Sequence, residues 1–375
     1  MIRGILRMVA LTAVVYVSAC STAVDVDPGP DDPGLPDVPS VRMEVAAYHP
    51  YWATSAWSQY DMDLLDVLFF FDLPISPTGT IEDRRGWPHA WFDLIAAAES
   101  ADTPIHVTVS ILEAHVFRSV FSTPTYVQTL EETLVDLSAS GSVSGLHLDV
   151  ELFEPVSDQE RNAFTDLVRR LSVRLKQGRP DFQLSIFLTA TDPAEAYDDQ
   201  ALAAAVDFVV IQAYDLHWLT SPTAGPVSPL HGWGDRNWGA ILARAEQNGI
   251  QREKMLFSVP YYGYEWPTVD SLSGAATRGP GRLTTYAPAL VGVPAARDRA
   301  ILNGMQRDPV SGSPWYAIQD STGWTQGWYE DATSLALKYD FVQQEALRGV
   351  AIFPYAYGDA TLESALRDAR MTPLP

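Results

Sequence analysis

Short apolar runs alternate with amphipathic segments along most of the chain, from Met43 onward. The apolar runs predict strands over residues 45–51, 65–72, 105–112, 145–151, 182–190, 208–214, 255–261 and 350–355. The amphipathic segments predict helices over residues 89–101, 125–138, 158–177, 194–205, 238–248, 331–345 and 361–370. Eight strands, most of them followed by a helix, predict an α/β fold, the (β/α)8 TIM barrel.

The stretch 264–327 does not follow this alternation of apolar and amphipathic segments. It is rich in Gly, Pro and Ser, and it contains no clear helical pattern. We therefore expect a small insertion after the seventh strand, inside a barrel domain that covers residues 43–375.

The N-terminus resembles an export signal. Arg3 and Arg7 precede an apolar run over 8–17 that is too short to span a bilayer. The residues Val-Ser-Ala-Cys over 17–20 resemble a bacterial lipobox, and Cys20 is the only cysteine in the chain. We expect a lipoprotein signal peptide over 1–19, lipidation of Cys20, and export to the outer membrane or cell surface.

The segment that follows Cys20 is acidic and rich in proline. Residues 25–40 hold five Asp and five Pro but no Lys or Arg. Such a composition cannot bury enough apolar surface to form a core, so residues 20–42 are expected to be an extended tether.

Charge and composition limit the classes of molecule that the barrel is expected to bind. The formal net charge of −22 argues against nucleic acid or an anionic membrane as a partner and fits a neutral polysaccharide. The chain has 11 Trp and 16 Tyr, and aromatic faces that are not needed for packing are platforms for sugar rings. Membrane contact is expected only through the lipid anchor.

Candidate chemistry lies on the fourth predicted strand. His147, Asp149 and Glu151 alternate with apolar residues, so they share one face of that strand. In a β/α barrel the C-terminal ends of the strands carry the active site. A negative charge on Asp149 would oppose ionisation of Glu151, which is how a general acid is kept protonated near neutral pH. The alternative is a solvated outer face with a chance pair of acids.

Several motifs in chain order carry a family resemblance. The fourth strand reads Ser-Gly-Leu-His-Leu-Asp-Val-Glu over 144–151, and the sixth reads Gln-Ala-Tyr-Asp-Leu-His over 212–217. The seventh reads Val-Pro-Tyr-Tyr-Gly over 259–263, followed later by Trp-Tyr-Glu-Asp-Ala-Thr-Ser over 328–334 and Gly-Val-Ala-Ile-Phe over 349–353. Together these resemble glycoside hydrolase family 18, the chitinase family. The segments 262–266 and 314–316 look most like its bacterial cell-wall and spore-cortex branch.

The resemblance implies a mechanism and a set of site residues. It implies a retaining, substrate-assisted glycosidase that cleaves β-1,4 linkages of N-acetylglucosamine-containing glycans, chitin or peptidoglycan, without a cofactor or a metal, as a monomer. Glu151 would be the acid and base, Asp149 would orient the substrate acetamido group, Tyr214 would bind its oxygen, and Asp215 would hold the distorted sugar. The implied substrate-binding residues are His147, Gln212, Phe353, Tyr48, Trp52, Tyr262 and Trp266.

The chain departs from the family pattern at three positions. Ser144 replaces an outer Asp, and Phe353 replaces a Trp that floors the sugar subsite. His147 replaces an Asp that pairs with the middle acid of the strand. A neutral His147 is expected to donate a ring N–H to Asp149, and its protonation is expected to set the acid limb of activity at a pKa of about 6–7.

Two other functions are open at this point. His147 and Phe353 are compatible with a non-catalytic glycan-binding protein on the same barrel, although pure binding does not need Glu151. A metal-dependent hydrolase could use His147, Asp149 and His217, since imidazole and carboxylate bind zinc. No His-x-His or His-Glu-x-x-His motif supports this second alternative.

Overall fold

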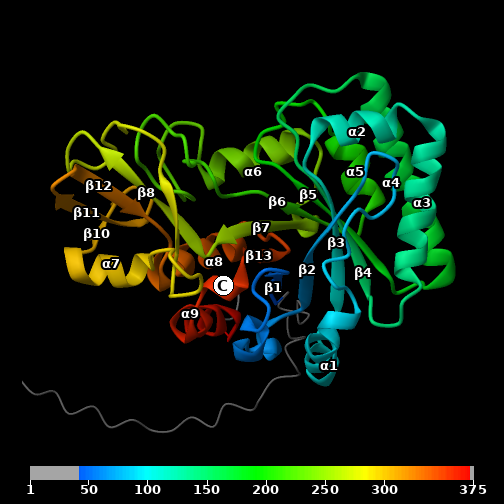
Figure 1. Cartoon of the computed structure of the whole chain (residues 1–375), viewed down its shortest axis with the longest axis horizontal. Helices are drawn as coiled ribbons and strands as arrows, with labels where there is room; N and C mark the ends of the chain where they lie inside the picture. The colour runs from blue at the N-terminus through cyan, green and yellow to red at the C-terminus, as the bar shows by residue number, and fades with distance from the viewer. Residues whose placement is uncertain (1–41, 372–375) are drawn as a thin grey trace, which may run out of the picture. The chain divides into compact units, whose positions relative to one another are not determined.

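The computed structural model describes residues 42–371, whose core is a closed eight-stranded parallel barrel (Figure 1). Its strands are β1 Glu44–Pro50, β2 Val67–Pro74, β3 Ile105–Ile111, β4 Gly145–Val150, β5 Gln183–Leu188, β6 Phe208–Ile211, β7 Met255–Pro260 and β13 Gly349–Phe353. They are hydrogen-bonded in the order β1-β13-β7-β6-β5-β4-β3-β2, with β1 closing on β2. The predicted TIM barrel is confirmed, and every predicted strand overlaps an observed one.

The α-helices among the described residues include two, α2 and the α7 of the insertion, that the sequence pattern did not predict. The helices that flank the barrel strands are α1 Phe92–Ser100, α2 Ala114–Phe121, α3 Pro124–Ser138, α4 Asp158–Gly178, α5 Asp199–Ala205, α6 Trp238–Gln247, α8 Ala332–Gln344 and α9 Ala360–Met371. Short 3-10 turns are η1 Ala56–Gln59, η2 Met62–Leu64, η3 His89–Trp91, η4 Arg252–Lys254 and η5 Tyr355–Tyr357. Helix α2 was missed because it is short and has no side-chain N-cap.

The barrel interior beneath the strand ends is filled with aromatic and imidazole rings. Phe69 stacks on His147 with ring centroids 4.2 Å apart, and Phe208 stacks on His106 at 6.0 Å. On β4 the inward His147 and Asp149 alternate with Leu146 and Leu148, which face the helices. The packed layer separates the C-terminal ends of the strands from the opposite end of the barrel.

The insertion lies between β7 and α8. It forms a five-stranded sheet in the order β10-β11-β12-β8-β9, with β8 Tyr262–Thr268, β9 Arg282–Thr285, β10 Gln306–Arg307, β11 Pro314–Asp320 and β12 Gly323–Trp328. It also contains helix α7 Ala296–Asn303, so the expectation of no helix was wrong. The pattern was hidden because α7 buries only Ala296 and Ala300, while Ile301 and Leu302 are exposed.

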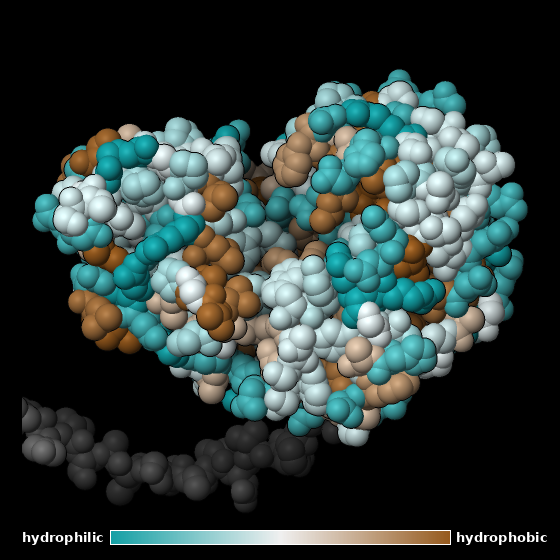
Figure 2. Space-filling model, viewed as in Figure 1, coloured by the Kyte–Doolittle hydropathy of each residue, from teal (hydrophilic) through white to brown (hydrophobic). Residues whose placement is uncertain are grey.

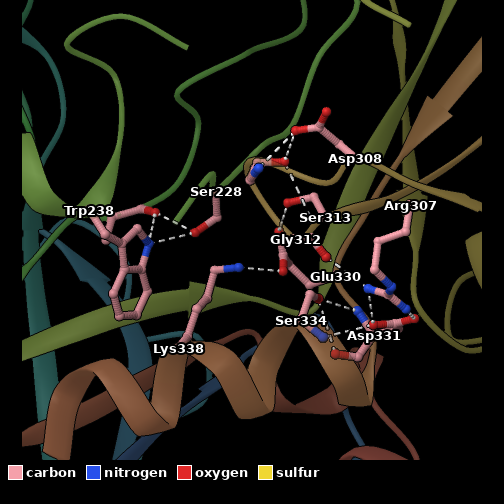
Figure 3. A network of polar contacts seen from close by, with 12 residues as sticks. Ser228, Trp238, Arg307, Asp308, Gly312, Ser313, Glu330, Asp331, Ser334 and Lys338 are labelled. Carbon is pink, nitrogen blue, oxygen red and sulfur yellow. Dashed lines mark hydrogen bonds and ion pairs between the residues drawn. The ribbon is translucent and has the colours of Figure 1, made fainter. Parts of the chain in front are cut away.

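A buried ion pair joins the insertion to the barrel (Figure 3). Lys338 of α8 donates to Glu330 at 2.6 Å, and neither side chain is exposed to solvent. Ser313, just before β11, donates to the other carboxylate oxygen of Glu330 at 3.1 Å. The next residue, Asp331, accepts from the backbone N–H of Ser334 and so caps α8. The Trp-Tyr-Glu-Asp segment therefore has a structural role at this joint.

Several sequence predictions fall outside this description. The predicted signal peptide, the lipidated Cys20 and all of the tether except residue 42 lie outside the described residues. Within residues 42–371, no helix combines the length and the apolar character needed to cross a bilayer.

Candidate active site

A small pocket opens at the C-terminal ends of the barrel strands. Its volume is about 120 Å³. It is lined by Tyr48, Phe71, Asp149, Glu151, Phe187, Gln212, Tyr214, Asp215, Tyr262 and Phe353. Figure 2 shows a notch at the upper edge of the molecule, between the insertion at the left and the helix-covered part of the barrel at the right. Pockets that enclose a whole small molecule usually measure about 300–1,000 Å³, so this one has room for a side arm of a sugar residue.

Two carboxyl groups come from the end of β4. Asp149 is the last inward residue of the strand and is only 3% exposed. Glu151 follows the strand directly and is less deeply buried. Burial, the charge of Glu151 and the charge of Asp72 together raise the pKa of Asp149 well above its ordinary value. Burial, followed by the charge of Asp215, raises the pKa of Glu151 to about 7. The two acids therefore titrate as a pair that retains a proton near neutral pH.

Two negative groups act on Glu151. The repulsion between Glu151 and Asp149 is mutual, as expected from the sequence, and the charge of Asp215 raises the pKa of Glu151 as well. Asp215 follows β6 with a φ of 55°, a left-handed conformation that is rare outside glycine. It accepts hydrogen bonds from Tyr262 at 2.7 Å and from Tyr264 at 3.0 Å. Burial raises the pKa of Asp215 to about 6, although the two hydroxyls oppose the shift.

Aromatic rings form the walls around these acids. Phe353 lies parallel to Tyr214 with ring centroids 6.1 Å apart, and it meets Tyr48 edge to face at 5.5 Å. Phe71 adds a further edge contact to Phe353 at 5.2 Å. These rings shield the acids from solvent, which strengthens the interactions between the charged groups.

His147 lies below the pocket and does not line it. Its Nε2 is 2.8 Å from the hydroxyl of Tyr48, and its Nδ1 is 2.8 Å from the hydroxyl of Ser185. The expected hydrogen bond to Asp149 is therefore wrong, because both ring nitrogens already have partners. Burial lowers the pKa of His147 well below its ordinary value, so this ring stays neutral.

The two predicted tryptophans also lie outside the pocket. Trp266 is fully buried in β8 and donates its indole N–H to the backbone carbonyl of Trp218 at 3.1 Å. A buried ring has no face to offer a sugar, so Trp266 supports the insertion sheet instead. Trp52 is 39% exposed and meets Phe71 edge to face at 6.0 Å, which places it at the rim. Its indole N–H donates to Tyr357 at 2.9 Å.

The sequence reasoning missed four side chains near the site. Phe71 and Phe187 line the pocket, Tyr264 binds Asp215, and Asp72 raises the pKa of Asp149. The three aromatic residues could not be separated from core residues by pattern alone. Asp72 did carry a signal, since it is an acid inside an otherwise apolar strand.

The structure does not bring together the three side chains that a metal-dependent hydrolase would need, His147, Asp149 and His217. His217 directs its Nδ1 toward the carbonyl of Pro226 at 2.8 Å and packs against Trp233, whereas His147 is bonded inside the barrel. Within residues 42–371, no group of three or more His, Cys, Asp or Glu side chains is arranged to hold a metal ion.

A comparison with known protein families identifies the family to which this chain belongs. Glycosyl hydrolases family 18 matches residues 44–357, which span the whole barrel from β1 to η5. The chain belongs to glycosyl hydrolases family 18. The matched region includes Asp149 and Glu151 at the end of β4, the Tyr214–Asp215 pair and the five-stranded sheet of the insertion.

Similar proteins include bacterial and plant members of the family. A Bacillus subtilis (strain 168) protein named as a sporulation-specific glycosylase is 25% identical over 302 residues, covering 77% of this chain and 65% of that protein. The chain thus spans somewhat less than two thirds of that relative. The Bacillus megaterium spore cortex-lytic enzyme SleL superposes with a TM-score of 0.70 at 19% identity, covering 88% of this chain and 75% of the other. A Cycas revoluta family 18 chitinase, solved as a complex with allosamidin, gives a TM-score of 0.74 at 18% identity, covering 87% and 98%. These solved structures share the fold of this family 18 chain.

Proposed function

We propose that the protein is a retaining glycoside hydrolase that cleaves β-1,4 linkages of N-acetylglucosamine-containing glycans by a substrate-assisted mechanism. The observation that carries this proposal is the paired acids at the end of β4, where Glu151 has a pKa of about 7. A carboxyl group that is half protonated near neutral pH can both give and take a proton in one reaction cycle.

The first step uses Glu151 as a general acid. Its proton passes to the glycosidic oxygen as the bond between that oxygen and the anomeric carbon breaks. The oxygen of the substrate's 2-acetamido group attacks the same carbon from the opposite side, and an oxazolinium ion forms with inversion at that carbon. The pocket of about 120 Å³ beneath Glu151 has room for that acetamido arm.

Asp149 and Tyr214 are the groups that meet the acetamido arm. Both line the pocket, and both are at least nine-tenths buried. An ionised Asp149 accepts the acetamido N–H and stabilises the positive charge of the oxazolinium ion. The Tyr214 hydroxyl, whose pKa burial raises well above its ordinary value, stays protonated and donates to the acetamido oxygen. In the second step water attacks the anomeric carbon, its proton passes to Glu151, and the bond between that carbon and the acetamido oxygen breaks. This second inversion restores the original configuration.

Asp215, Tyr262, Gln212 and Phe353 surround the sugar ring itself. Asp215 is held by the hydroxyls of Tyr262 and Tyr264, and it is positioned to accept from a sugar hydroxyl. Phe353 offers a flat apolar face next to Tyr48. Trp52 at the rim is the candidate platform for the next sugar residue.

The direct test is incubation of the full-length chain with chitin oligomers and, separately, with peptidoglycan. Mass spectrometry identifies the products, and NMR of the newly formed reducing end reports its anomeric configuration. We expect cleavage of at least one substrate with initial release of the β-anomer. Release of the α-anomer would overturn the substrate-assisted mechanism, and no cleavage of either substrate would overturn the glycosidase.

The second candidate is a non-catalytic glycan-binding protein. It is motivated by β4, which carries His147 where the family pattern has an acid. The two candidates predict different results for Glu151→Gln. In a pure binding protein this variant binds chitin oligomers as the wild type does, and neither protein yields products. In an enzyme only the variant fails to yield products.

We also propose that the protein is an exported lipoprotein anchored through Cys20. This proposal is supported by the lipobox-like residues 17–20 and by the acidic, proline-rich segment that follows them. Cys20→Ser should move the protein from the membrane fraction to the soluble fraction. A wild-type protein whose mass shows an unprocessed, unlipidated N-terminus would contradict the anchor.

A further inference from the structure

The peptide bond between Val150 and Glu151 lies just beyond the last paired residues of β4 and β5, which are Asp149 and Phe187. On the β3 side, the backbone N–H of Glu151 donates to the carbonyl of Ile111 at 3.2 Å. The two polar groups of a trans peptide bond point in opposite directions, so the carbonyl of Val150 points to the β5 side. A buried carbonyl needs a hydrogen-bond donor, and here the donor comes from outside the strand pair.

The hydroxyl of Tyr197 supplies that donor. Tyr197 lies in the loop between β5 and α5, and its hydroxyl donates to the carbonyl of Val150. Burial raises the pKa of this phenol well above its ordinary value, so the hydroxyl stays protonated and able to donate. A side chain from a loop thus takes the place that a backbone N–H of a longer β5 would hold, directly before Glu151.

The loop that carries Tyr197 is itself fixed by an acid. The carboxylate of Asp192 accepts from the backbone N–H groups of Ala196 and Tyr197, each at 3.0 Å. Asp side chains order turns in this way, because they bind backbone groups a few residues further along the chain. The cap therefore holds the backbone of Tyr197 where its hydroxyl reaches β4.

The same loop also contacts the segment that follows Glu151. The backbone N–H of Val156 donates to the carbonyl of Ala194 at 2.9 Å. Arg161 of α4 donates to the carbonyl of Glu195 at 3.2 Å. The loop between β5 and α5 is therefore bonded to the chain on both sides of Glu151.

We propose that Tyr197 is a positioning residue, whose hydroxyl fixes the peptide bond that carries Glu151 and so directs its carboxyl group toward the glycosidic oxygen. The proposal rests on the glycosidase function proposed above. Tyr197 is not among the residues that line the pocket, so it acts through Glu151. A general acid works only within hydrogen-bond reach of the leaving oxygen, and a misplacement of about 1 Å can lower a rate about 10²-fold.

The kinetic test compares two leaving groups in Tyr197→Phe, which removes only the hydroxyl. A sugar leaving group needs the proton of Glu151, whereas a dinitrophenolate leaves without one. The quantity measured is kcat/KM, which covers the steps up to the oxazolinium ion. We expect it to fall about tenfold on chitin oligomers and to stay within about twofold of the wild type on the dinitrophenyl glycoside of the same oligomer. Tyr126→Phe, the same chemical change on α3, should leave both values unchanged.

A merely structural Tyr197 gives a different pattern. A loss of folded protein lowers kcat/KM by the same factor on both substrates, and that result would make the proposal wrong. Wild-type values of the variant on both substrates would overturn it as well.

Asp192→Asn is the second variant, because it leaves the phenol in place and removes one of the two acceptor oxygens of the cap. We expect a loss of about threefold in kcat/KM that is confined to chitin oligomers. An equal loss on the dinitrophenyl glycoside would speak against positioning of Glu151 by this loop.

Hydrogen exchange separates this inference from the proposed function, because it needs no substrate. NMR follows the backbone amides of Glu151 and Val156 in the full-length wild type and in Tyr197→Phe. We expect exchange about tenfold faster at both amides in the variant, with unchanged exchange in β1. Equal rates at Glu151 overturn the role of Tyr197 even if the enzyme is active. Faster exchange in a protein that cleaves no glycan supports the role of Tyr197 in fixing this peptide bond and refutes the glycosidase.

Discussion

The hydroxyl of Tyr48 lies 2.8 Å from Nε2 of His147, and Nδ1 of the same ring lies 2.8 Å from the hydroxyl of Ser185. Ser185 is 3.5 Å from the backbone carbonyl of Leu146 and donates to it. This chain is satisfied when Tyr48 donates to a neutral ring, which donates in turn to Ser185. The replacement at position 147 therefore places a neutral hydrogen-bonded ring where the family pattern has an acid.

His147→Asn tests whether this ring titrates in the working pH range. Burial lowers the pKa of His147 well below its ordinary value, so the ring stays neutral where a free imidazole would titrate. We expect the acid limb of kcat/KM to have the same midpoint in both proteins, with kcat/KM about tenfold lower in the variant because the shorter side chain breaks the chain to Ser185. A midpoint that moves by a full pH unit would restore the sequence-based assignment of the acid limb to His147.

Glu151→Gln removes the proton donor and keeps the shape of the side chain. Loss of a general acid typically lowers the rate by about 10²–10⁴-fold, and we expect kcat to fall by that factor while chitin oligomers still bind. Calorimetry measures binding and product analysis measures turnover. A variant that turns over at close to the wild-type rate would refute the assignment of Glu151.

The wild-type pH profile should be a narrow bell. Glu151 must be protonated in the first step, and its pKa is about 7, so activity falls as the pH rises above about 7. Asp215 must be ionised to accept from the sugar, and its pKa is about 6, so activity falls as the pH drops below about 6. The optimum therefore lies between these values, with the limbs reporting the coupled acids of the site. Constant activity from pH 5 to 9 would contradict this arrangement.

Lys338→Met leaves the buried Glu330 without its cation. Breaking a buried ion pair on one side costs about 3–5 kcal/mol, and we expect a loss of that size in the free energy of unfolding. Denaturant unfolding of the two proteins measures the difference. The double variant Glu330→Gln with Lys338→Met is the control, because it removes the uncompensated charge and should recover part of the loss.

The sequence by itself determined the barrel and the acids of β4. Apolar runs that alternate with amphipathic segments are typical of a β/α fold, so the eight strands and seven of the helices could be located from the pattern. Position along a strand also fixes which residues share a face, and the strand ends of a barrel meet at one site. For these reasons the strand pattern predicts Asp149 and Glu151 as site residues, the family resemblance adds Tyr214 and Asp215, and all four line one pocket.

Only the tertiary structure decided how these residues interact. Hydrogen-bond partners and pKa shifts depend on side chains from other strands, and no local pattern encodes them. His147 finds Tyr48 on β1 and Ser185 on β5, Glu151 is affected by Asp215 from β6, and Asp149 is affected by Asp72 from β2. Likewise, the local sequence does not distinguish the exposed Trp52 from the buried Trp266. The burial of each ring depends on elements distant in sequence that pack over it.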